Sequence, residues 1–327
     1  MEVPVLAPGT RVGPYVVERP LAGGGFGEVY AAQHATLGRP VALKVLHSRH
    51  AQNTDLVRRF LREAQMVASI RDPAIVALYD AGVDEPQRIW LAMELLQGIE
   101  LRERIYRSAP IGAEVGLRWA GQIARALGAV HAQGVIHRDL KPGNVFVVQT
   151  PEGEAMKLID FGIAKIVRPE DGQTMLTRTG ESLGTPLYMA PEQFRDAKRV
   201  DARADIYSLG ALLYELFTRR APIVATTFPE MVAQILSGTK PPPLQSLRSD
   251  LPRHVPDLVH KAMAVDPNDR FQSAEEMLHA MQAPQPTRGR RRRGKLGGTM
   301  GGTLRGPSAP PVSGFDATIL QDDESKD

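Results

Sequence analysis

The stretch HRDLKPGN, residues 137–144, decides how this chain is read. It places four charged or titratable side chains, a proline, a glycine and an asparagine within eight positions. Segments of this polarity normally form turns at the surface. This one lies between two apolar runs, LGAVHAQGVI before it and VFVV after it. The question is why a chain brings these side chains to a point where it is about to enter its core.

Length and composition set broad limits on the answer. The chain has 327 residues, of which 43% are hydrophobic and 24% charged, which is typical of a globular protein with about two domains. No apolar run approaches the roughly 20 residues that span a bilayer, and the N-terminus MEVPVLAPGT does not resemble a signal peptide. Cysteine is absent, so disulfides and thiolate metal sites are excluded. The simplest interpretation is a cytoplasmic protein.

The positive charge is concentrated in the tail. The formal net charge is +3, but the run RGRRRRGK, residues 288–295, holds five arginines and a lysine, and without it the net charge would be −3. The whole tail, residues 284–327, is dominated by Pro, Gly, Arg and Ser and is expected to be disordered. The basic run is interpreted as a solubilising linker, a contact to a membrane surface or partner, or a nucleic-acid contact.

The first third of the chain has the pattern of short strands around one helix. Leu56, Phe60, Ala64 and Val67 recur at helical spacing within NTDLVRRFLREAQMVASI. The predicted strands are a pair joined by a glycine turn in YVVERPLAGGGFGEVYAAQH, a third in RPVALKVLH, and two more in AIVALYDAG and RIWLAMELL.

The pattern becomes helical from about residue 99. A long helix ends near Gly134, with one apolar face formed by Val115, Trp119, Ile123, Leu127 and Val130. Short strands are predicted in VFVV and MKLIDFG, followed by a loop over about 163–188. Further helices are predicted over 203–219, 228–237, 256–264 and 273–281.

Two features of the strand-rich part carry weak signals when taken alone. Glycines in LAGGGFGEV would let backbone N–H groups approach a phosphate, yet a glycine-rich hairpin is more often only a turn. The stretch fits neither a dinucleotide fingerprint nor a P-loop. Lys44 lies in an apolar strand, where it is either a solvated edge charge or an inward charge paired with Glu63 of the following helix.

The quoted stretch and LIDFG together indicate phosphoryl transfer. That reaction needs metal ions on the phosphates, a cation beside them and a carboxylate that orients the attacking hydroxyl. Asp139, Lys141, Asn144 and Asp160 supply these groups, and each lies beside a predicted strand that could hold it.

The motifs resemble those of the protein kinase family. In the family's order the chain carries GGGFGEV, VALK, REA, HRDLKPGN, DFG, APE, DIYSLG and DPNDR, and it is most similar to the bacterial eukaryotic-like serine/threonine protein kinases. The resemblance covers residues 12–283 and implies an α+β fold with two lobes. A small antiparallel sheet with one regulatory helix would occupy 12–96, and a larger, mostly α-helical lobe 97–283. Residues 1–11 would be an N-terminal extension.

The resemblance implies roles for the charged residues. Lys44 would bind the α- and β-phosphates of ATP and pair with Glu63 when its helix swings in. Asp139 would be the catalytic base and Lys141 would stabilise the transferred phosphate. The metal ligands, for Mg²⁺ or alternatively Mn²⁺, would be Asn144 and Asp160.

The resemblance also implies an ATP-binding set and a structural set. The gatekeeper would be Met93, and backbone groups just after it would bind the adenine edge. The ATP-binding set is Leu21, Ala22, Gly23, Gly24, Gly25, Phe26, Gly27, Val29, Ala42, Lys44, Met93, Glu94, Leu96 and Phe146. Asp205 would brace the catalytic loop, and Glu192 would pair with Arg270. Ala22 stands where the family usually has glycine.

Substrate class and switching follow from the same resemblance. Lys141 and Thr185 in GTPLYMAPE are typical of serine/threonine kinases. Arg138 would bind a phosphate on the activation loop, with Thr177 and Thr179 as the expected autophosphorylation sites. Thr174 and Ser182 are weaker candidates there. Three tail residues are candidate docking sites for phosphothreonine-reading domains: Thr299, Thr303 and Thr318.

The expected partners are ATP and protein substrates, with a homodimer through the strand-rich lobe as a further prediction. No transmembrane segment is expected, and nucleic acid is not expected as a partner because its case rests on the tail alone. The alternative function is a pseudokinase scaffold. That alternative would need the loss of Lys44, Asp139 or Asp160, and all three are present.

Overall fold

A computed structural model of the chain describes residues 5–24, 27–46, 54–84, 88–107, 109–161, 186–195 and 199–282. The chain divides into two units, residues 1–285 and 286–327. The fold and the candidate site lie in the first unit. The domain boundaries predicted from the sequence stay predictions, and the tail lies outside the described residues.

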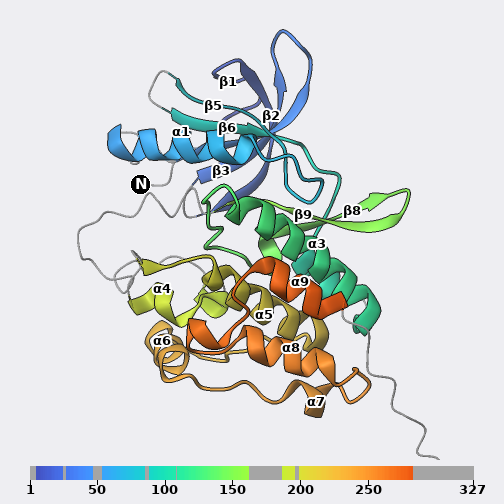
Figure 1. Ribbon diagram of the computed structural model, residues 1–327. Coiled ribbons are helices and arrows are strands. Elements are labelled where there is room, and N and C mark those ends of the chain that lie inside the picture. Colours follow the sequence, from blue (N-terminus) through green and yellow to red (C-terminus); the bar gives the residue numbers. More distant parts are fainter. Residues whose placement is uncertain are drawn as a thin grey trace, which may run out of the picture. The chain divides into compact units, whose positions relative to one another are not determined.

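The first lobe is an antiparallel sheet of six strands in the order β1–β2–β3–β4–β6–β5 (Figure 1). Its strands are β1 Arg11–Val12, β2 Tyr15–Gly24, β3 Gly27–His34, β4 Pro40–Leu46, β5 Leu78–Asp84 and β6 Arg88–Met93.

Strand β4 shows how the sheet positions a charged residue. Its alternate side chains Val41, Leu43 and Val45 are buried in one apolar cluster with Trp90. Ala42 and Leu46 belong instead to the main core cluster. Because successive side chains of a strand point to opposite faces, Lys44 shares the face of Ala42 and Leu46. Its ammonium is therefore directed toward the core side and not toward solvent.

Helix α1, Thr54–Ala68, packs on this face of the sheet (Figure 1). Phe60, Ala64 and Val67 are at most 3% exposed and lie in the main core cluster. These are residues of the predicted helical stripe, so the 3.6-residue period correctly indicated the buried face. Glu63 lies next to that stripe and is partly buried.

The second lobe combines a three-stranded sheet with helices (Figure 1). The sheet order is β7–β8–β9, with β7 Gly98–Glu100, β8 Val145–Thr150 and β9 Gly153–Leu158. The α-helices are α2 Leu101–Arg107, α3 Ala113–His131, α4 Pro191–Arg195, α5 Arg203–Thr218, α6 Phe228–Ser237, α7 Leu244–Leu247, α8 His254–Ala262 and α9 Ala274–Gln282. Short 3₁₀ helices are η2 Pro142–Asn144, η5 Pro186–Tyr188 and η7 Pro267–Asp269.

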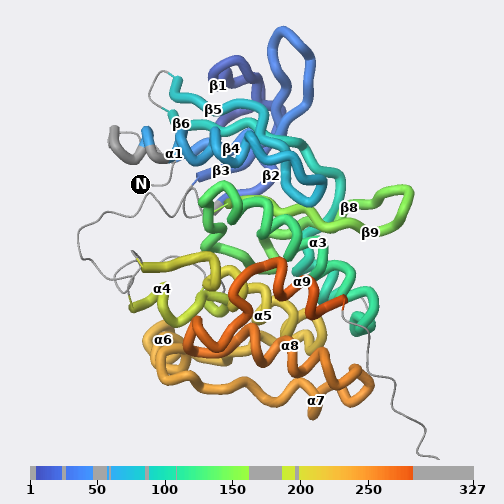
Figure 2. Tube along the Cα trace, viewed as in Figure 1, coloured from blue at the N-terminus to red at the C-terminus, as the bar shows by residue number. Residues whose placement is uncertain are grey.

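Helix α5 passes through the middle of the helical lobe, as the trace in Figure 2 shows. Every residue from Ala204 to Phe217 is buried. A helix that is apolar all round is normally a core helix. The same burial places Asp205, in the first turn of α5, at 0% exposure. A carboxylate in that position needs hydrogen-bond donors from its neighbours.

The segment from Ala74 to Ala77 departs from the sequence prediction. The prediction places the start of a strand here, but β5 begins only at Leu78. The backbone of the segment bonds elsewhere: Val76 N donates to Leu158 O at 2.9 Å, and Leu158 N donates to Ala74 O at 2.7 Å. The segment therefore joins β9 of the helical lobe instead of extending β5.

Candidate active site

Asp205 anchors the stretch HRDLKPGN from below. Its two carboxylate oxygens accept the backbone N–H groups of His137 and Arg138, each at 2.8 Å, and His131 Nε2 lies 2.8 Å from Oδ2. Burial by itself would raise the pKa of Asp205. The hydrogen bond and charge of His131, together with His137, outweigh burial and hold the pKa below its ordinary value. The anchor is therefore an ionised carboxylate.

Asp139 and its neighbours form a polar cluster just above this anchor. Asn144 Nδ2 donates to the Asp139 carbonyl at 2.8 Å and to Oδ2 of its carboxylate at 2.9 Å. Lys141 Nζ lies 3.2 Å from the same Oδ2. Asn144 ends helix η2 and is 6% exposed. The carboxylate of Asp139 is thus held between an amide and an ammonium.

Asp160 lies beside this cluster. Ile159, its chain neighbour, donates its N–H to Asn144 O at 3.0 Å. The carbonyl of Ile159 lies 3.2 Å from His137 Nε2. The backbone of Asp160 has φ of 53°, a left-handed conformation that Asp adopts more readily than most residues. These contacts fix the start of the DFG motif against the Asp139 cluster.

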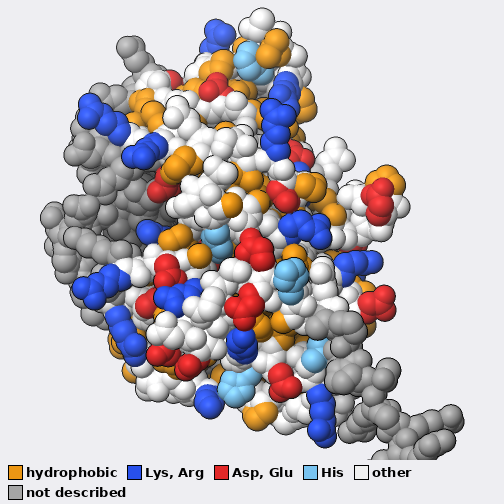
Figure 3. All heavy atoms as spheres, in the orientation of Figure 1, with side chains coloured by type: hydrophobic (Ala, Val, Ile, Leu, Met, Phe, Trp, Pro, Cys, Tyr) orange, Lys and Arg blue, Asp and Glu red, His pale blue; other side chains and the backbone are white. Residues whose placement is uncertain are grey.

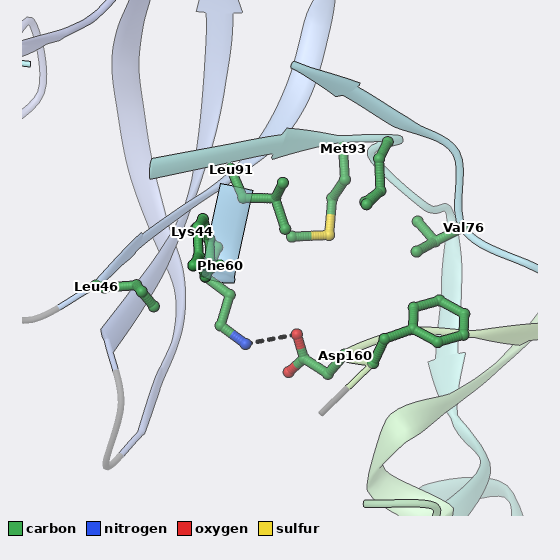
Figure 4. A pocket seen from close by; sticks show the side chains of 9 residues that line it. Lys44, Leu46, Phe60, Val76, Leu91, Met93 and Asp160 are labelled. Atoms are coloured by element: carbon green, nitrogen blue, oxygen red, sulfur yellow. Dashed lines mark hydrogen bonds and ion pairs between the residues drawn. The ribbon is translucent and has the colours of Figure 1, made fainter. Parts of the chain in front are cut away.

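Lys44 meets Asp160 across a pocket between the two lobes (Figure 4). The distance from Lys44 Nζ to Asp160 Oδ1 is 2.6 Å, although the residues are 116 positions apart. The remaining lining is apolar and comes from both lobes: Leu46, Phe60, Val76, Leu78, Leu91, Met93 and Phe161. The arrangement brings a cation and a carboxylate together at one apolar pocket, and the bond from Ile159 N to Asn144 O links this carboxylate to the Asp139 cluster.

Comparison with known proteins identifies the family of this fold. A family model described as the protein kinase domain matches residues 15–282. The chain belongs to the protein kinase family. The prediction of a two-lobed kinase fold is thereby confirmed, with the antiparallel sheet in the small lobe and the helices in the large one.

The kinase domain has close counterparts among bacterial proteins. It is 39% identical over 284 residues to serine/threonine-protein kinase pkn2 of Myxococcus xanthus, covering 85% of this chain and 34% of that protein. It is 36% identical to serine/threonine-protein kinase PknB of Mycolicibacterium smegmatis, covering 80% of this chain and 42% of that protein. The chain thus spans less than half the length of these curated relatives.

Solved kinase structures agree with the fold. The kinase domain of Mycobacterium tuberculosis PknI superposes with a TM-score of 0.65 at 29% identity, covering 85% of this chain and 98% of that one. Rad53 residues 1–466 in complex with AMP-PNP superposes with a TM-score of 0.65 at 26% identity, covering 81% of this chain and 63% of that one.

Glu63 of the kinase domain is not among the described ion-pair partners of Lys44. Among the described residues, the ion pair made by Lys44 is the one with Asp160. Burial raises the pKa of Glu63, and the charge of Arg138 partly offsets the rise. The family pairing, expected only after the helix has moved inward, is therefore not among the described ion pairs in this arrangement of α1.

Of the expected ATP-binding residues, Lys44 and Met93 line this pocket, and the binding role of the set stays a prediction. Gly24 pairs with Gly27 and Ala22 with Val29 in the β2–β3 hairpin, whereas Gly25 and Phe26 lie outside the described residues. A Cβ at Gly27 would collide with the carbonyl of Val45, so this glycine is also needed for packing against β4. The further expected residues are placed as follows: Leu21 and Gly23 in β2, Ala42 opposite Met93 in the β4–β6 pair, Glu94 and Leu96 directly after β6, and Phe146 in β8.

The structural pair of the helical lobe is close, and its arginine is fully buried. Arg270 donates to both carboxylate oxygens of Glu192, at 2.6 and 2.8 Å. Its guanidinium also donates to the carbonyls of Arg203, Ala264 and Val265. Three further expected residues lie outside the described residues: Thr177, Thr179 and Thr185.

Sequence reasoning missed three contributors to this site. Phe161 lies 5.0 Å from His137 between ring centroids and lines the pocket. His131 bonds to Asp205 from the end of α3. Lys157 pairs with Glu94 at 2.7 Å. The available signal for Lys157 was the same as for Lys44: a lysine within an apolar strand, here MKLI.

Proposed function

We propose that this domain is a serine/threonine protein kinase that transfers the γ-phosphate of ATP to hydroxyl groups of proteins. The observation that carries the proposal is the 2.6 Å contact of Lys44 with Asp160 beside the Asp139 cluster. It supports a nucleotide site because these groups match the charge pattern that phosphoryl transfer requires. The named activity of the bacterial relatives supports it as well.

Lys44, Asn144 and Asp160 would hold the nucleotide and its metal. The amide nitrogen of Asn144 is engaged by Asp139, so its amide oxygen is the atom suited to a cation. A carboxylate and an amide oxygen fit Mg²⁺, which usually binds few protein oxygens together with substrate phosphates. Mn²⁺ would suit the same ligands. When bound, the ion neutralises negative charge on the phosphates. Lys44 would then leave Asp160 for the α- and β-phosphates.

Asp139 would orient the acceptor hydroxyl and accept its proton. Its carboxylate is held in place by Asn144 and by Lys141, which lies 3.2 Å away. Lys141 would contact the phosphoryl group in transfer as well as the base. Lys141 two positions after the base also supports serine/threonine specificity over tyrosine specificity.

Regulation would act on the Glu63 pairing. Inward movement of α1 would exchange the Lys44–Asp160 contact for a Lys44–Glu63 contact. Phosphates on Thr177 and Thr179 would each bring about −1.5 to −2 charges and would be held by Arg138. Loss of activation in a Thr177→Ala, Thr179→Ala double variant is the expected result, and unchanged activity would reject this switch.

The remaining proposals concern partners and compartment. The use of ATP suggests the cytoplasm. No helix in the described part of the chain is long and apolar enough to cross a membrane. Lys, Arg, Asp and Glu are interspersed on the face in Figure 3, and the expectation that nucleic acid is not a partner stays a prediction. Homodimerisation through the six-stranded sheet stays a prediction.

The decisive experiment is incubation with radiolabelled ATP, Mg²⁺ and generic acceptor proteins. Wild type should label serine and threonine, and Asp139→Asn should lower the rate by about 10²- to 10⁴-fold while ATP binding remains. A wild-type protein that binds ATP but transfers no phosphate would favour the pseudokinase alternative. Phosphotyrosine as the main product would reject the proposed specificity.

A further inference from the structure

An ion pair that the proposed mechanism does not use lies at the junction of the lobes. Residues 94–97 connect β6 to β7 and are called the interlobe linker here. Glu94 is its first residue, and its Oε2 lies 2.7 Å from Nζ of Lys157 in β9. The pair therefore joins the linker to a strand of the helical lobe.

The segment from 74 to 77, which precedes β5, is hydrogen-bonded to this pair. Glu94 N donates to Ala77 O at 2.9 Å, and Ala77 N donates to Glu94 Oε2 at 3.3 Å. Lys157 Nζ also lies 3.4 Å from Ile75 O. Ile75 forms a parallel bridge to Leu158. One ammonium and one carboxylate thus tie together the linker, the segment from 74 to 77, and β9.

The surroundings indicate that the pair is held in place. The side chains of Lys157 and Glu94 are 17% and 29% exposed. Lys157 lies between Met156 and Leu158, which are both buried. A mostly desolvated ammonium is costly unless acceptors compensate, and here the carboxylate and the Ile75 carbonyl do so. Release of Lys157 would leave Glu94 without its cation.

The position of Lys157 relates the pair to the nucleotide site. Lys157 stands directly opposite Phe146 in the β8–β9 pair. Opposite residues of an antiparallel pair project from the same face. Phe146 is expected to contact the adenine, and the backbone of Glu94 and Leu96 to bind its polar edge. The ion pair therefore connects the two structures that would bind the base from different sides.

We propose that Lys157 and Glu94 form a positioning pair that fixes the interlobe linker for adenine binding, a role that rests on the proposed function. The pair holds the linker backbone at the level of β8 without itself contacting the phosphates. Its loss lets the linker shift relative to Phe146. The affinity for nucleotide then falls, whereas the rate of phosphoryl transfer from bound ATP changes little.

The test measures AMP-PNP binding with Mg²⁺ by titration calorimetry in Lys157→Gln, Glu94→Gln and the double variant. Each single variant should raise the Kd about three- to fivefold, the range expected for a partly exposed ion pair. The double variant should be no weaker than the weaker single, because both changes remove one interaction. In kinase assays Lys157→Gln should raise the KM for ATP and keep kcat within about twofold.

A matched control lies on the same strand. Glu154 of β9 pairs with Arg104 of α2 at 2.8 Å, with side-chain exposures of 23% and 22%. Glu154→Gln should lower the thermal midpoint about as much as Lys157→Gln, yet leave the Kd unchanged. Lys157→Arg, which keeps the charge, should restore most of the affinity. If a glutamine variant does not fold, Glu94→Asp replaces it in the binding measurement, because it keeps the charge and withdraws the carboxylate from Lys157.

The outcomes separate this inference from the proposed function. Failure of the wild type to bind AMP-PNP would reject the proposed function itself. Wild-type binding together with an unchanged Kd in the Lys157 and Glu94 variants would overturn only the positioning role. The positioning role is also overturned if Glu154→Gln weakens binding equally, or if the two single effects add in the double variant.

Discussion

Glu192–Arg270 and Lys44–Asp160 are both ion pairs with an N–O distance of 2.6 Å, yet their surroundings differ. The side chain of Arg270 is 0% exposed, and its guanidinium is also bonded to three named carbonyls of the helical lobe. Lys44 has one carboxylate partner among the described residues, and that partner is 35% exposed. In the first pair the guanidinium is fully buried and Glu192 is 19% exposed, whereas the second pair opens onto a pocket.

The Glu192–Arg270 pair is a fixed part of the fold, whereas the Lys44–Asp160 contact can be exchanged. The polar groups around Arg270 find their partners inside the helical lobe, so their arrangement follows from folding. The partner of Lys44 comes from the other lobe, and a ligand or Glu63 could replace it. Removing one charge should therefore lower the free energy of unfolding more at the Glu192–Arg270 pair than at the Lys44–Asp160 pair.

The largest effect is expected for Arg270→Met. Removing the guanidinium leaves Glu192 and three carbonyls without their donor, which should lower the free energy of unfolding by about 3–5 kcal/mol. Urea denaturation measures the change. The matched control is Arg107→Met, because Arg107 is 74% exposed in its pair with Glu103, and it should cost under about 0.5 kcal/mol. Equal losses of unfolding free energy in both variants would mean that the buried Arg270 pair is no more important for stability than an exposed pair.

A smaller loss is expected for Asp205→Asn. The amide keeps the shape but loses charge-assisted bonds to the N–H groups of His137 and Arg138, at a cost of about 2–3 kcal/mol near neutral pH. The folded-state pKa of Asp205 lies below the ordinary 3.8. Its stabilisation is therefore complete above the unfolded-state pKa and is lost as pH falls through the folded-state pKa.

The difference between wild type and Asp205→Asn should consequently shrink when urea denaturation is repeated in acid. A difference that grows toward low pH would mean that the carboxyl group is protonated in the native protein. That result would contradict the ionised anchor.

The smallest stability effect is expected for Lys44→Met, about 1 kcal/mol or less, because the partner carboxylate is more than a third exposed. Lys261→Met removes a more exposed pair with Glu276, outside the pocket, and should cost no more than Lys44→Met. Nucleotide binding separates the two, since Lys44→Met should abolish it and Lys261→Met should not affect it. A large stability loss in Lys44→Met would mean that this pair is a fixed part of the fold, like Glu192–Arg270.

Sequence reasoning found what is local and periodic. The stripe of Phe60, Ala64 and Val67 gave the buried face of α1, and the predicted helix over 203–219 is observed as Arg203–Thr218. Within HRDLKPGN, the short spacing between Asp139 and Asn144 allows the contact that is observed. Such features depend on a few neighbouring residues, so the sequence contains most of what determines them.

The missed features depend on how the lobes meet. Ala74 reads as a strand residue, but its carbonyl bonds to Leu158 of the other lobe. The partner of Lys157 comes from the linker, and the observed partner of Lys44 is Asp160, whereas the sequence suggests Glu63. Periodicity carries no information on lobe orientation, which is why these pairings could not be chosen from the sequence.

The left-handed backbone at Asp160 and Arg138, with φ of 53° and 59°, affects how inactive variants should be chosen. Alanine there loses the side chain and also adds a conformational penalty of about 1–2 kcal/mol. Asparagine tolerates that backbone. The Asp160→Asn variant thus tests the loss of the carboxylate charge alone. Comparing its stability with that of Asp160→Ala measures the conformational penalty of the left-handed backbone.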